Sequence, residues 1–207
     1  MGAKCPVFIV VGDASIRQHL VKTLRAEQYQ PTPFANGRDF LEALHYLPPG
    51  VALVELQLPD RNGMDVLEHL LSERKDIAVI MTAAHAEIRK AVQAIKRGAD
   101  DFIEQPFSQH LLLDTIAQAS SLLRARTEYQ HDKDYAEYCL GKLTKREIDI
   151  LRALEVNKNN QLTADQLQLS LRTVETYRSR IMKKCGVTKF SDAISICSLS
   201  SNSQKSS

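Results

Sequence analysis

Residues 143–187 read LTKREIDILRALEVNKNNQLTADQLQLSLRTVETYRSRIMKKCGV, and this stretch decides the fold of the C-terminal third. Thr144 and Glu147 have the spacing of a capping box, in which the hydroxyl and the carboxylate satisfy free amide groups at a helix start. Apolar residues then recur at helical spacing, at Ile148, Leu151 and Leu154. The pattern predicts an amphipathic helix that begins directly after Thr144.

Two further helices are expected in the same stretch. Thr163 and Gln166 repeat the capping-box spacing and predict a short second helix that opens at Thr163. Ser170 is the expected N-cap of a third helix over Leu171–Lys184, with an apolar inward stripe. A short helix, a tight turn and a longer helix are typical of a helix-turn-helix.

The outward side of the third helix carries basic and hydrogen-bonding side chains, which suit the major groove of duplex DNA. We predict that nine residues contact DNA: Arg172, Thr173, Glu175, Thr176, Arg178, Ser179, Arg180, Lys183 and Lys184. Glu175, Thr176 and Ser179 are assigned to base edges, where a carboxylate accepts from cytosine N4 and a threonine contacts the thymine methyl. The five basic residues are assigned mainly to phosphates. The alternative is an ordinary helical bundle with a solvated basic face.

The whole stretch resembles the DNA-binding domain of LuxR-type regulators, without insertion or deletion. The shared motifs are L-T-x-R-E at 143–147, Asn160 with Ala164, and S-x-R-T-V at 170–174. Three positions depart from the family pattern: Asn157 stands for glycine, Tyr177 for histidine, and Leu162-Thr163 for Glu-Ile. Asn157 is tolerable there, because asparagine accepts a left-handed backbone.

The first part of the chain alternates short apolar runs with amphipathic segments, which predicts a doubly wound parallel sheet. The expected strands are Phe8–Val11, Val51–Val54 and Ile77–Met81, with Gln30–Phe34 and Asp101–Glu104 as weaker candidates. The expected helices are Ser15–Glu27, Gly37–Tyr46, Met64–Arg74, Ala86–Arg97 and Ser108–Ala125. The functional crevice of such a fold lies at the carboxyl ends of the strands.

Residues 5–124 resemble the receiver domain of two-component response regulators, and 101–107 is similar to the FixJ branch of the NarL/FixJ family. That resemblance implies a cis peptide bond before Pro106. It also implies six positions of a phosphorylation pocket: Gly12, Asp13, Glu55, Thr82, Phe102 and Gln105. Asp13, Thr82 and the switch aromatic Phe102 match the family.

Three pocket positions depart from that pattern. Gly12 replaces a metal-binding acid, Glu55 the phosphoacceptor aspartate, and Gln105 the lysine that balances the phosphoryl charge. Mg²⁺ needs strict octahedral oxygen ligation, so we expect its binding to be weak or absent. Phosphoryl transfer depends on positioning and charge stabilisation, so we predict that aspartyl phosphorylation does not switch this protein.

Glu55 has two interpretations that the sequence leaves open. Its longer carboxylate could mimic phospho-aspartate, engage Thr82 and bias Phe102 inward. Alternatively, the pocket has decayed and the domain survives as a dimerisation scaffold. Control of the altered pocket by a small ligand is a third hypothesis.

The predicted fold class is α/β plus all-α: a doubly wound (βα)5 receiver-like domain, a linker helix and a four-helix LuxR-type helix-turn-helix. We expect the receiver at 1–124, the linker at 125–140, the helix-turn-helix domain at 141–200 and a disordered tail at 201–207. Residues 141–207 hold 12 Lys and Arg against 6 Asp and Glu, a balance of +6. Residues 1–140 hold 15 against 19, a balance of −4, so the basic part is the one expected to meet phosphates.

These observations predict a bacterial transcription regulator, not an enzyme, that binds double-stranded DNA in the cytoplasm and associates with the nucleoid. The family implies a homodimer through the face built by residues 86–125. Another regulator or a sensor kinase is a further candidate partner, and no membrane contact is expected, because no apolar run is long enough to span a bilayer. The four scattered cysteines lack metal-ligand spacing, so no metal or cofactor is predicted. The alternative function is an adaptor or anti-activator that pairs with another regulator.

Overall fold

The structure, a computed structural model, describes residues 4–84 and 88–201. The chain folds as two compact units, a first unit over Met1–Arg126 and a second unit over Thr127–Ser207. The start of the predicted helix Ala86–Arg97 and nearly all of the predicted tail 201–207 lie outside the described residues. In the described part, no helix is both long and apolar enough to cross a bilayer.

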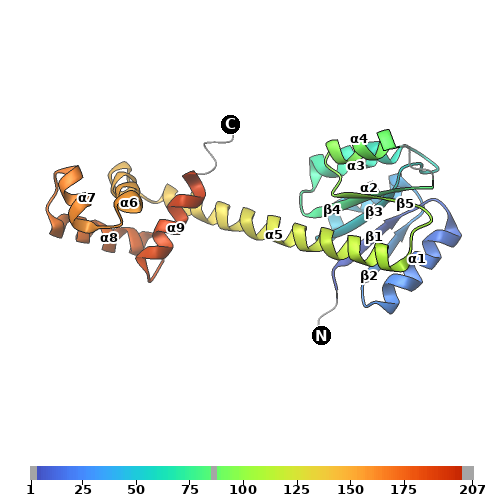
Figure 1. Ribbon diagram of the computed structural model, residues 1–207, viewed down its shortest axis with the longest axis horizontal. Coiled ribbons are helices and arrows are strands. Elements are labelled where there is room, and N and C mark those ends of the chain that lie inside the picture. The colour runs from blue at the N-terminus through green and yellow to red at the C-terminus, as the bar shows by residue number, and fades with distance from the viewer. Residues whose placement is uncertain (1–3, 85–87, 202–207) are drawn as a thin grey trace. The chain divides into compact units, whose positions relative to one another are not determined.

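The first unit is built on a five-stranded parallel sheet, which confirms the predicted (βα)5 fold, and its strand order is β2-β1-β3-β4-β5 (Figure 1). Its strands are β1 (Pro6–Val10), β2 (Gln30–Phe34), β3 (Gly50–Glu55), β4 (Ile77–Ala83) and β5 (Asp101–Glu104). Pro31 and Pro33 of β2 lie two residues apart, so their backbone nitrogens point to the same side of the strand. Because proline donates no backbone hydrogen bond, they fit the edge position that β2 occupies.

Helices cover both faces of this sheet (Figure 1). One face packs against α1 (Ala14–Ala26) and the first turns of α5 (Gln109–Gly141), and the other against α2 (Gly37–Ala43), α3 (Gly63–Glu73) and α4 (Ile88–Lys96). A short 3₁₀ turn, η1 (Leu44–Tyr46), follows α2. Successive strand residues point to opposite faces, so Val7 and Ile9 enter one core while Phe8 and Val10 enter the other.

Helix α5 runs without interruption from Gln109 to Gly141 and so includes the predicted linker. Ile116, Ala119 and Leu123 are buried against the sheet of the first unit. At the end of the first unit, a guanidinium nitrogen of Arg126 lies 2.6 Å from a carboxylate oxygen of Asp100, whose side chain is buried. This ion pair ties α5 to the turn that enters β5.

Between the end of α5 and residue 201, the described part of the second unit contains four further helices, which confirms the predicted four-helix domain. They are α6 (Lys145–Asn157), α7 (Asn160–Leu167), α8 (Leu171–Cys185) and α9 (Phe190–Ser201). The capping box of Thr144 and Glu147 is present at the start of α6, and Ser170 caps α8. Helix α8 ends at Cys185 and is followed by Gly186, whose φ of 67° lies in the left-handed region that glycine adopts without strain.

Two sequence predictions about this unit were wrong in detail. Helix α7 begins at Asn160 and not at Thr163, because the Asn159 side chain accepts the amide hydrogens of Gln161 and Leu162. Thr163 is buried within the helix, and its hydroxyl donates to the Asn159 carbonyl. The left-handed residue after α6 is Lys158, with φ 52°, whereas Asn157 stays helical.

Candidate functional site

The residues predicted for the first unit meet at the carboxyl ends of its strands. Gly12 and Asp13 follow β1, Glu55 ends β3, and Gln105 follows β5. Glu55 lies opposite Thr82 of β4 in the parallel ladder, and Phe102 of β5 lies opposite Met81. The sheet therefore brings the predicted pocket residues to one edge. Phe102 is half-buried and packs against the core below α3 and α4.

The Glu55 carboxylate turns back toward the loop between β1 and α1. Its Oε2 accepts the backbone N–H of Gly12 at 2.7 Å. The carbonyl of the same Gly12 accepts a hydrogen bond from Arg17 Nη1 at 2.9 Å, and Val11 O accepts from the same nitrogen at 2.6 Å. A carboxylate and a guanidinium thus fix this loop from two sides. Arg17 is not among the residues predicted from the sequence, where its position one turn into α1 is the signal that could have indicated this role.

Asp13 caps the start of α1. Its Oδ1 accepts the amide hydrogens of Ser15 at 2.8 Å and Ile16 at 2.9 Å, and the Ser15 hydroxyl at 2.7 Å. The hydrogen bond from the Ile16 amide, followed by that from the Ser15 hydroxyl, lowers the pKa of this carboxyl. Asp13 is therefore held in its charged form by the helix that it starts.

Gln105 is buried, and its Nε2 donates to the hydroxyl of the fully buried Thr82 at 3.3 Å. The Gln105–Pro106 peptide bond is cis, as the resemblance implied. An amide at this position can donate a hydrogen bond but carries no positive charge. The Thr82 hydroxyl and the Gln105 amide at the carboxyl end of the sheet are therefore hydrogen-bonded to each other.

Space around the pocket is restricted at two glycines. A Cβ at Gly12 would lie 2.9 Å from Pro59 Cδ and 3.5 Å from Glu55 Oε2, so an acid there requires the proline ring to move. A Cβ at Gly63, the first residue of α3, would clash with the Glu55 carbonyl oxygen. Within residues 4–84 and 88–201, no three His, Cys, Asp or Glu side chains are grouped to hold a metal ion.

The second predicted site, on α8, presents a row of exposed polar side chains. Arg172, Thr176, Ser179 and Lys183 follow one another at spacings of four, three and four residues, which places them on one face of the helix. We call these four residues the outward row. The Thr176 and Ser179 hydroxyls donate to carbonyls of their own helix, at 2.8 and 3.2 Å.

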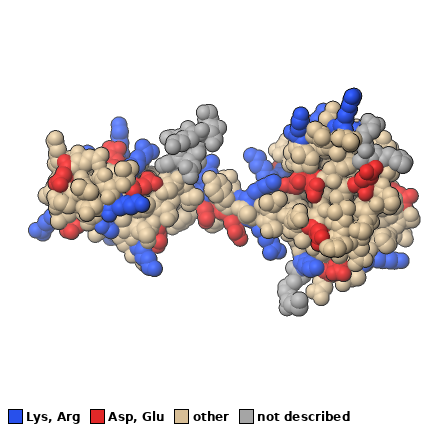
Figure 2. Space-filling model, in the orientation of Figure 1, with Lys and Arg blue, Asp and Glu red and all other residues tan. Residues whose placement is uncertain are grey.

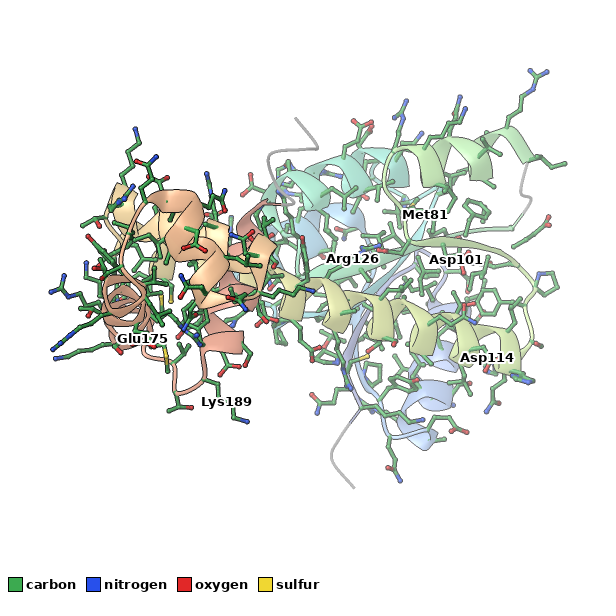
Figure 3. All side chains as sticks on the ribbon, turned by 60° about the vertical axis from the view of Figure 1, so that its left-hand side comes forward. Met81, Asp101, Asp114, Arg126, Glu175 and Lys189 are labelled. Atoms are coloured by element: carbon green, nitrogen blue, oxygen red, sulfur yellow. The ribbon has the colours of Figure 1, made fainter. Side chains whose placement is uncertain are left out.

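Three other predicted residues flank this row. Glu175 and Arg180 are exposed, and Figure 3 shows Glu175 on the helix. Thr173 is half-buried, and its hydroxyl lies 2.7 Å from that of Ser170 at the start of α8. Basic side chains project from the surface of this unit (Figure 2).

Arg178 and Lys184, which the sequence analysis assigned mainly to phosphates, bond other helices of their own unit. Arg178 Nη1 donates to Asn160 Oδ1 at 2.6 Å, and its guanidinium lies 4.2 Å from the centre of the Phe190 ring. Arg178 therefore connects α8 with the starts of α7 and α9. Lys184 Nζ lies 2.7 Å from Glu147 Oε2.

The partner of Lys184 is the buried acid of the α6 capping box, of which 4% is exposed. Burial raises the pKa of Glu147, but hydrogen bonds from Lys184 and from Thr144 outweigh burial, and its pKa is lowered. Lys184 therefore neutralises a buried charge.

The end of α8 is held by α5. The Tyr135 hydroxyl donates to the Cys185 carbonyl at 3.0 Å, and the Cys139 thiol points to the same oxygen at 3.8 Å. The last four carbonyls of an α-helix have no hydrogen-bond partner within the helix. The Tyr135 hydroxyl therefore satisfies one of these carbonyls at the end of α8.

Comparison with known proteins matches both units. The family model of the response regulator receiver domain matches residues 7–117, and that of the luxR family of bacterial regulatory proteins matches 141–197. The transcriptional regulatory protein TdiR of Thauera aromatica is 30% identical over 192 residues, which are 92% of this chain and 84% of that protein. FixJ of Rhizobium meliloti is 30% identical over 178 residues, 86% and 87% of the two chains.

Among solved structures, that of the response regulator StyR superposes with a TM-score of 0.74 at 28% identity, covering 94% of this chain and 99% of that one. Full-length FixJ from B. japonicum superposes with a TM-score of 0.63 at 24% identity, covering 97% and 99%, and supports the fold.

Proposed function

The chain belongs to the response regulators that join a receiver domain to a LuxR-type DNA-binding domain, and we propose that it regulates transcription without being switched by aspartyl phosphorylation. It is a DNA-binding transcription regulator of the two-component type, a family that is not enzymatic. We place the receiver at 1–124, the linker at 125–140 within α5, and the DNA-binding domain at 141–200.

The observation that carries phosphorylation independence is the 2.7 Å hydrogen bond from the Gly12 amide to Glu55. Through this bond, a carboxylate oxygen of the residue at the phosphoacceptor position is already engaged by the backbone of the same unit. The Thr82 hydroxyl bonds Gln105 instead of Glu55, which favours the decayed pocket over phosphate mimicry. With Gly12 in place of an acid and Gln105 in place of a lysine, neither a divalent cation nor a phosphoryl group would meet its usual charge partners.

Intact-mass spectrometry tests this proposal. The full-length protein is incubated with acetyl phosphate and Mg²⁺, beside a relative that retains the complete acidic pocket as a positive control. We expect no mass gain of one phosphoryl group. A stoichiometric gain that Glu55→Gln abolishes would refute the proposal.

For DNA recognition, we propose that Glu175, Thr176 and Ser179 contact base edges, while Arg172, Arg180 and Lys183 contact phosphates. Support comes from the exposure of all six side chains on or beside one face of α8. A gel-shift titration with genomic fragments, read at several salt concentrations, tests this function. Site-specific complexes are expected. The adaptor hypothesis predicts instead that binding is blind to sequence at every salt concentration.

We further propose that the receiver forms a homodimer through the face of residues 86–125. Helix α4 leaves Ile88, Val92 and Ile95 exposed at spacings of four and three residues, and Ile88 is 81% exposed. An apolar stripe of this kind is typical of an interaction surface. Sedimentation of the full chain and of Val92→Asp tests the dimer, which the charged variant is expected to weaken.

A further inference from the structure

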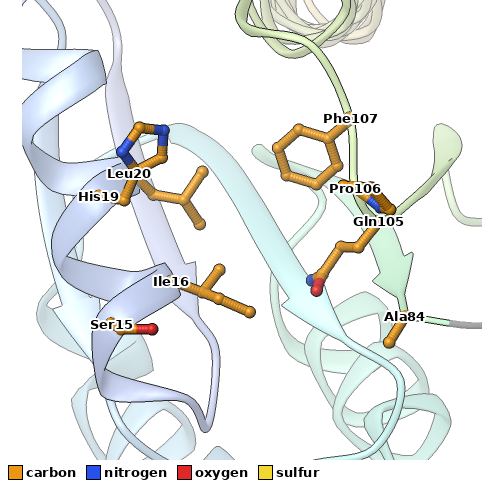
Figure 4. A pocket seen from close by; sticks show the side chains of 8 residues that line it. All are labelled: Ser15, Ile16, His19, Leu20, Ala84, Gln105, Pro106 and Phe107. Carbon is orange, nitrogen blue, oxygen red and sulfur yellow. The ribbon is translucent and has the colours of Figure 1, made fainter.

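A cavity of about 580 Å³ opens between α1 and the loop that joins β5 to α5 (Figure 4). Its size falls within the range of roughly 300–1,000 Å³ that is usual for small-molecule sites. The residues that line it are Ser15, Ile16, His19, Leu20, Ala84, Gln105, Pro106 and Phe107.

The lining has the chemistry of a site for an uncharged molecule. Ile16, Leu20 and Phe107 supply apolar walls, and none of the described lining residues is Asp, Glu, Lys or Arg. Among the described lining residues, a charged ligand would find no carboxylate, ammonium or guanidinium group to offset the hydration that it loses. The Phe107 ring, which faces the cavity in Figure 4, offers a stacking surface for a second ring.

Polar groups fix where such a ligand would bond. The Ser15 hydroxyl already donates to Asp13, and Gln105 Nε2 already donates to Thr82. Gln105 and His19 also line the cavity, and each of these side chains has an atom that can accept a hydrogen bond. A ligand with a hydrogen-bond donor on its ring complements this arrangement.

The cavity is connected to the residues that act as the switch in the family. Gln105 bonds Thr82 at 3.3 Å, and Thr82 lies on β4 beside β5, which carries Phe102. A molecule that bonds Gln105 is therefore one hydrogen bond away from the switch threonine.

We propose that this cavity binds a small uncharged molecule with one aromatic ring and a hydrogen-bond donor, and that its occupancy serves as the input signal in place of phosphorylation. The input role rests on the proposed phosphorylation independence. A lysine at position 105, as in the family, would bring a positive charge to the lining of this cavity, whereas Gln105 adds no charge.

Ligand-observed NMR on the full chain tests the site with defined probes. Phenol and indole are compared with charged benzoate and benzylamine, and with anisole, which lacks the donor. We expect the charged probes to bind at least about tenfold more weakly, because burying an unpaired charge costs more than the ~1.4 kcal/mol that a tenfold change represents. Anisole is expected to bind more weakly than phenol.

Three variants test whether binding occurs in this cavity. Ile16→Trp fills it and is expected to reduce phenol affinity by about tenfold or more. Gln18→Trp, on the exposed part of α1 outside the lining, is the matched control and should bind like wild type. Gln105→Leu removes the acceptor, so phenol should lose its advantage over anisole. Circular dichroism checks that each variant is folded.

The input role is read from the amide signals of Thr82 and Phe102, which should shift as phenol saturates the protein. Equal phenol binding by wild type and Ile16→Trp would overturn the site. Failure of every neutral probe to bind would also overturn the site. The cavity would then be better explained as a docking surface for a helix of a partner protein. Binding without movement of the Thr82 and Phe102 signals would overturn the input role. None of these readouts uses phosphate, so a mass gain with acetyl phosphate would refute phosphorylation independence separately.

Discussion

The receiver pocket and the recognition helix α8 both keep the backbone of their family, but they differ in what their polar side chains bond. At the sheet edge, Asp13, Glu55 and Gln105 each bond a group of the same unit. On α8, the outward row faces solvent, and its two hydroxyls bond only carbonyls of their own helix. A retained fold therefore does not show that each of its sites retains its ligand. The partners of the individual side chains decide that.

The largest expected effect separates two neighbouring lysines of α8. Lys184→Ala leaves the buried Glu147 carboxylate without its cation and should lower the free energy of unfolding by about 2–3 kcal/mol. Lys183→Ala removes an exposed side chain and should change stability by less than about 0.5 kcal/mol. Urea denaturation of both variants measures the difference.

DNA affinity should respond in the opposite way to the same two substitutions, with a larger effect for Lys183→Ala than for Lys184→Ala. Lys183→Ala is expected to flatten the dependence of log affinity on log salt by about one unit, since the proposed phosphate contact of Lys183 would be lost. A Lys183→Ala protein that keeps the wild-type slope would remove this residue from the interface.

Arg178 and Arg180 should differ in the same way as the two lysines, one affecting stability and the other DNA affinity, but by a smaller amount. Arg178→Ala loses the bond to Asn160 and the contact with the Phe190 ring, and should destabilise the domain by about 1–2 kcal/mol. Arg180→Ala should leave the melting temperature nearly unchanged and weaken DNA binding at all sites alike. Thermal melts and gel shifts on both variants make the measurement, and equal melting temperatures would contradict the anchoring role of Arg178.

The pH dependence of stability should report on Glu147. Its pKa is lowered in the folded protein, so the stability that it contributes is present above the ordinary value of 4.5 and is lost as pH falls through the folded value. Wild type should therefore lose stability below pH 4.5 more steeply than Glu147→Gln. Denaturation curves across this range test the slope, and parallel slopes would count against a lowered pKa.

The smallest effect is expected at Glu55. Glu55→Gln keeps an oxygen that can accept the Gly12 amide, so stability and DNA affinity should change by no more than about 0.5 kcal/mol. Phosphate mimicry predicts instead a clear loss of DNA affinity on removal of this charge. Fluorescence anisotropy with and without acetyl phosphate distinguishes the two interpretations.

Much of the fold could be predicted because its signals are local. Apolar runs located the strands β1, β3 and β4, and the capping residues Thr144 and Ser170 located two of the helices. The strands β2 and β5 were only weaker candidates, because their sequences are less apolar. The start of α7 was misplaced because Thr163 has the spacing of a cap, whereas Asn159 has a side chain that reaches two amides.

The direction of individual side chains could not be predicted from the motif. Arg178 and Lys184 belong to the same basic helix as Lys183, but their partners Asn160 and Glu147 lie 18 and 37 residues away in the sequence. Arg17 could not be predicted for a related reason. It donates to backbone carbonyls of the β1–α1 loop, and because every residue has such a carbonyl, the sequence does not indicate which ones accept.

The contact between Gly63 and the Glu55 carbonyl has a consequence for which side chains position 55 of this chain can carry. Only hydrogen fits at that contact, and the carbonyl of the neighbouring Leu56 accepts the Gly63 amide hydrogen at 2.7 Å, so backbone contacts hold the main chain here whatever side chain position 55 carries. Natural variation or protein engineering can therefore exchange the acid at position 55 for another group, and back again, without rebuilding the loop.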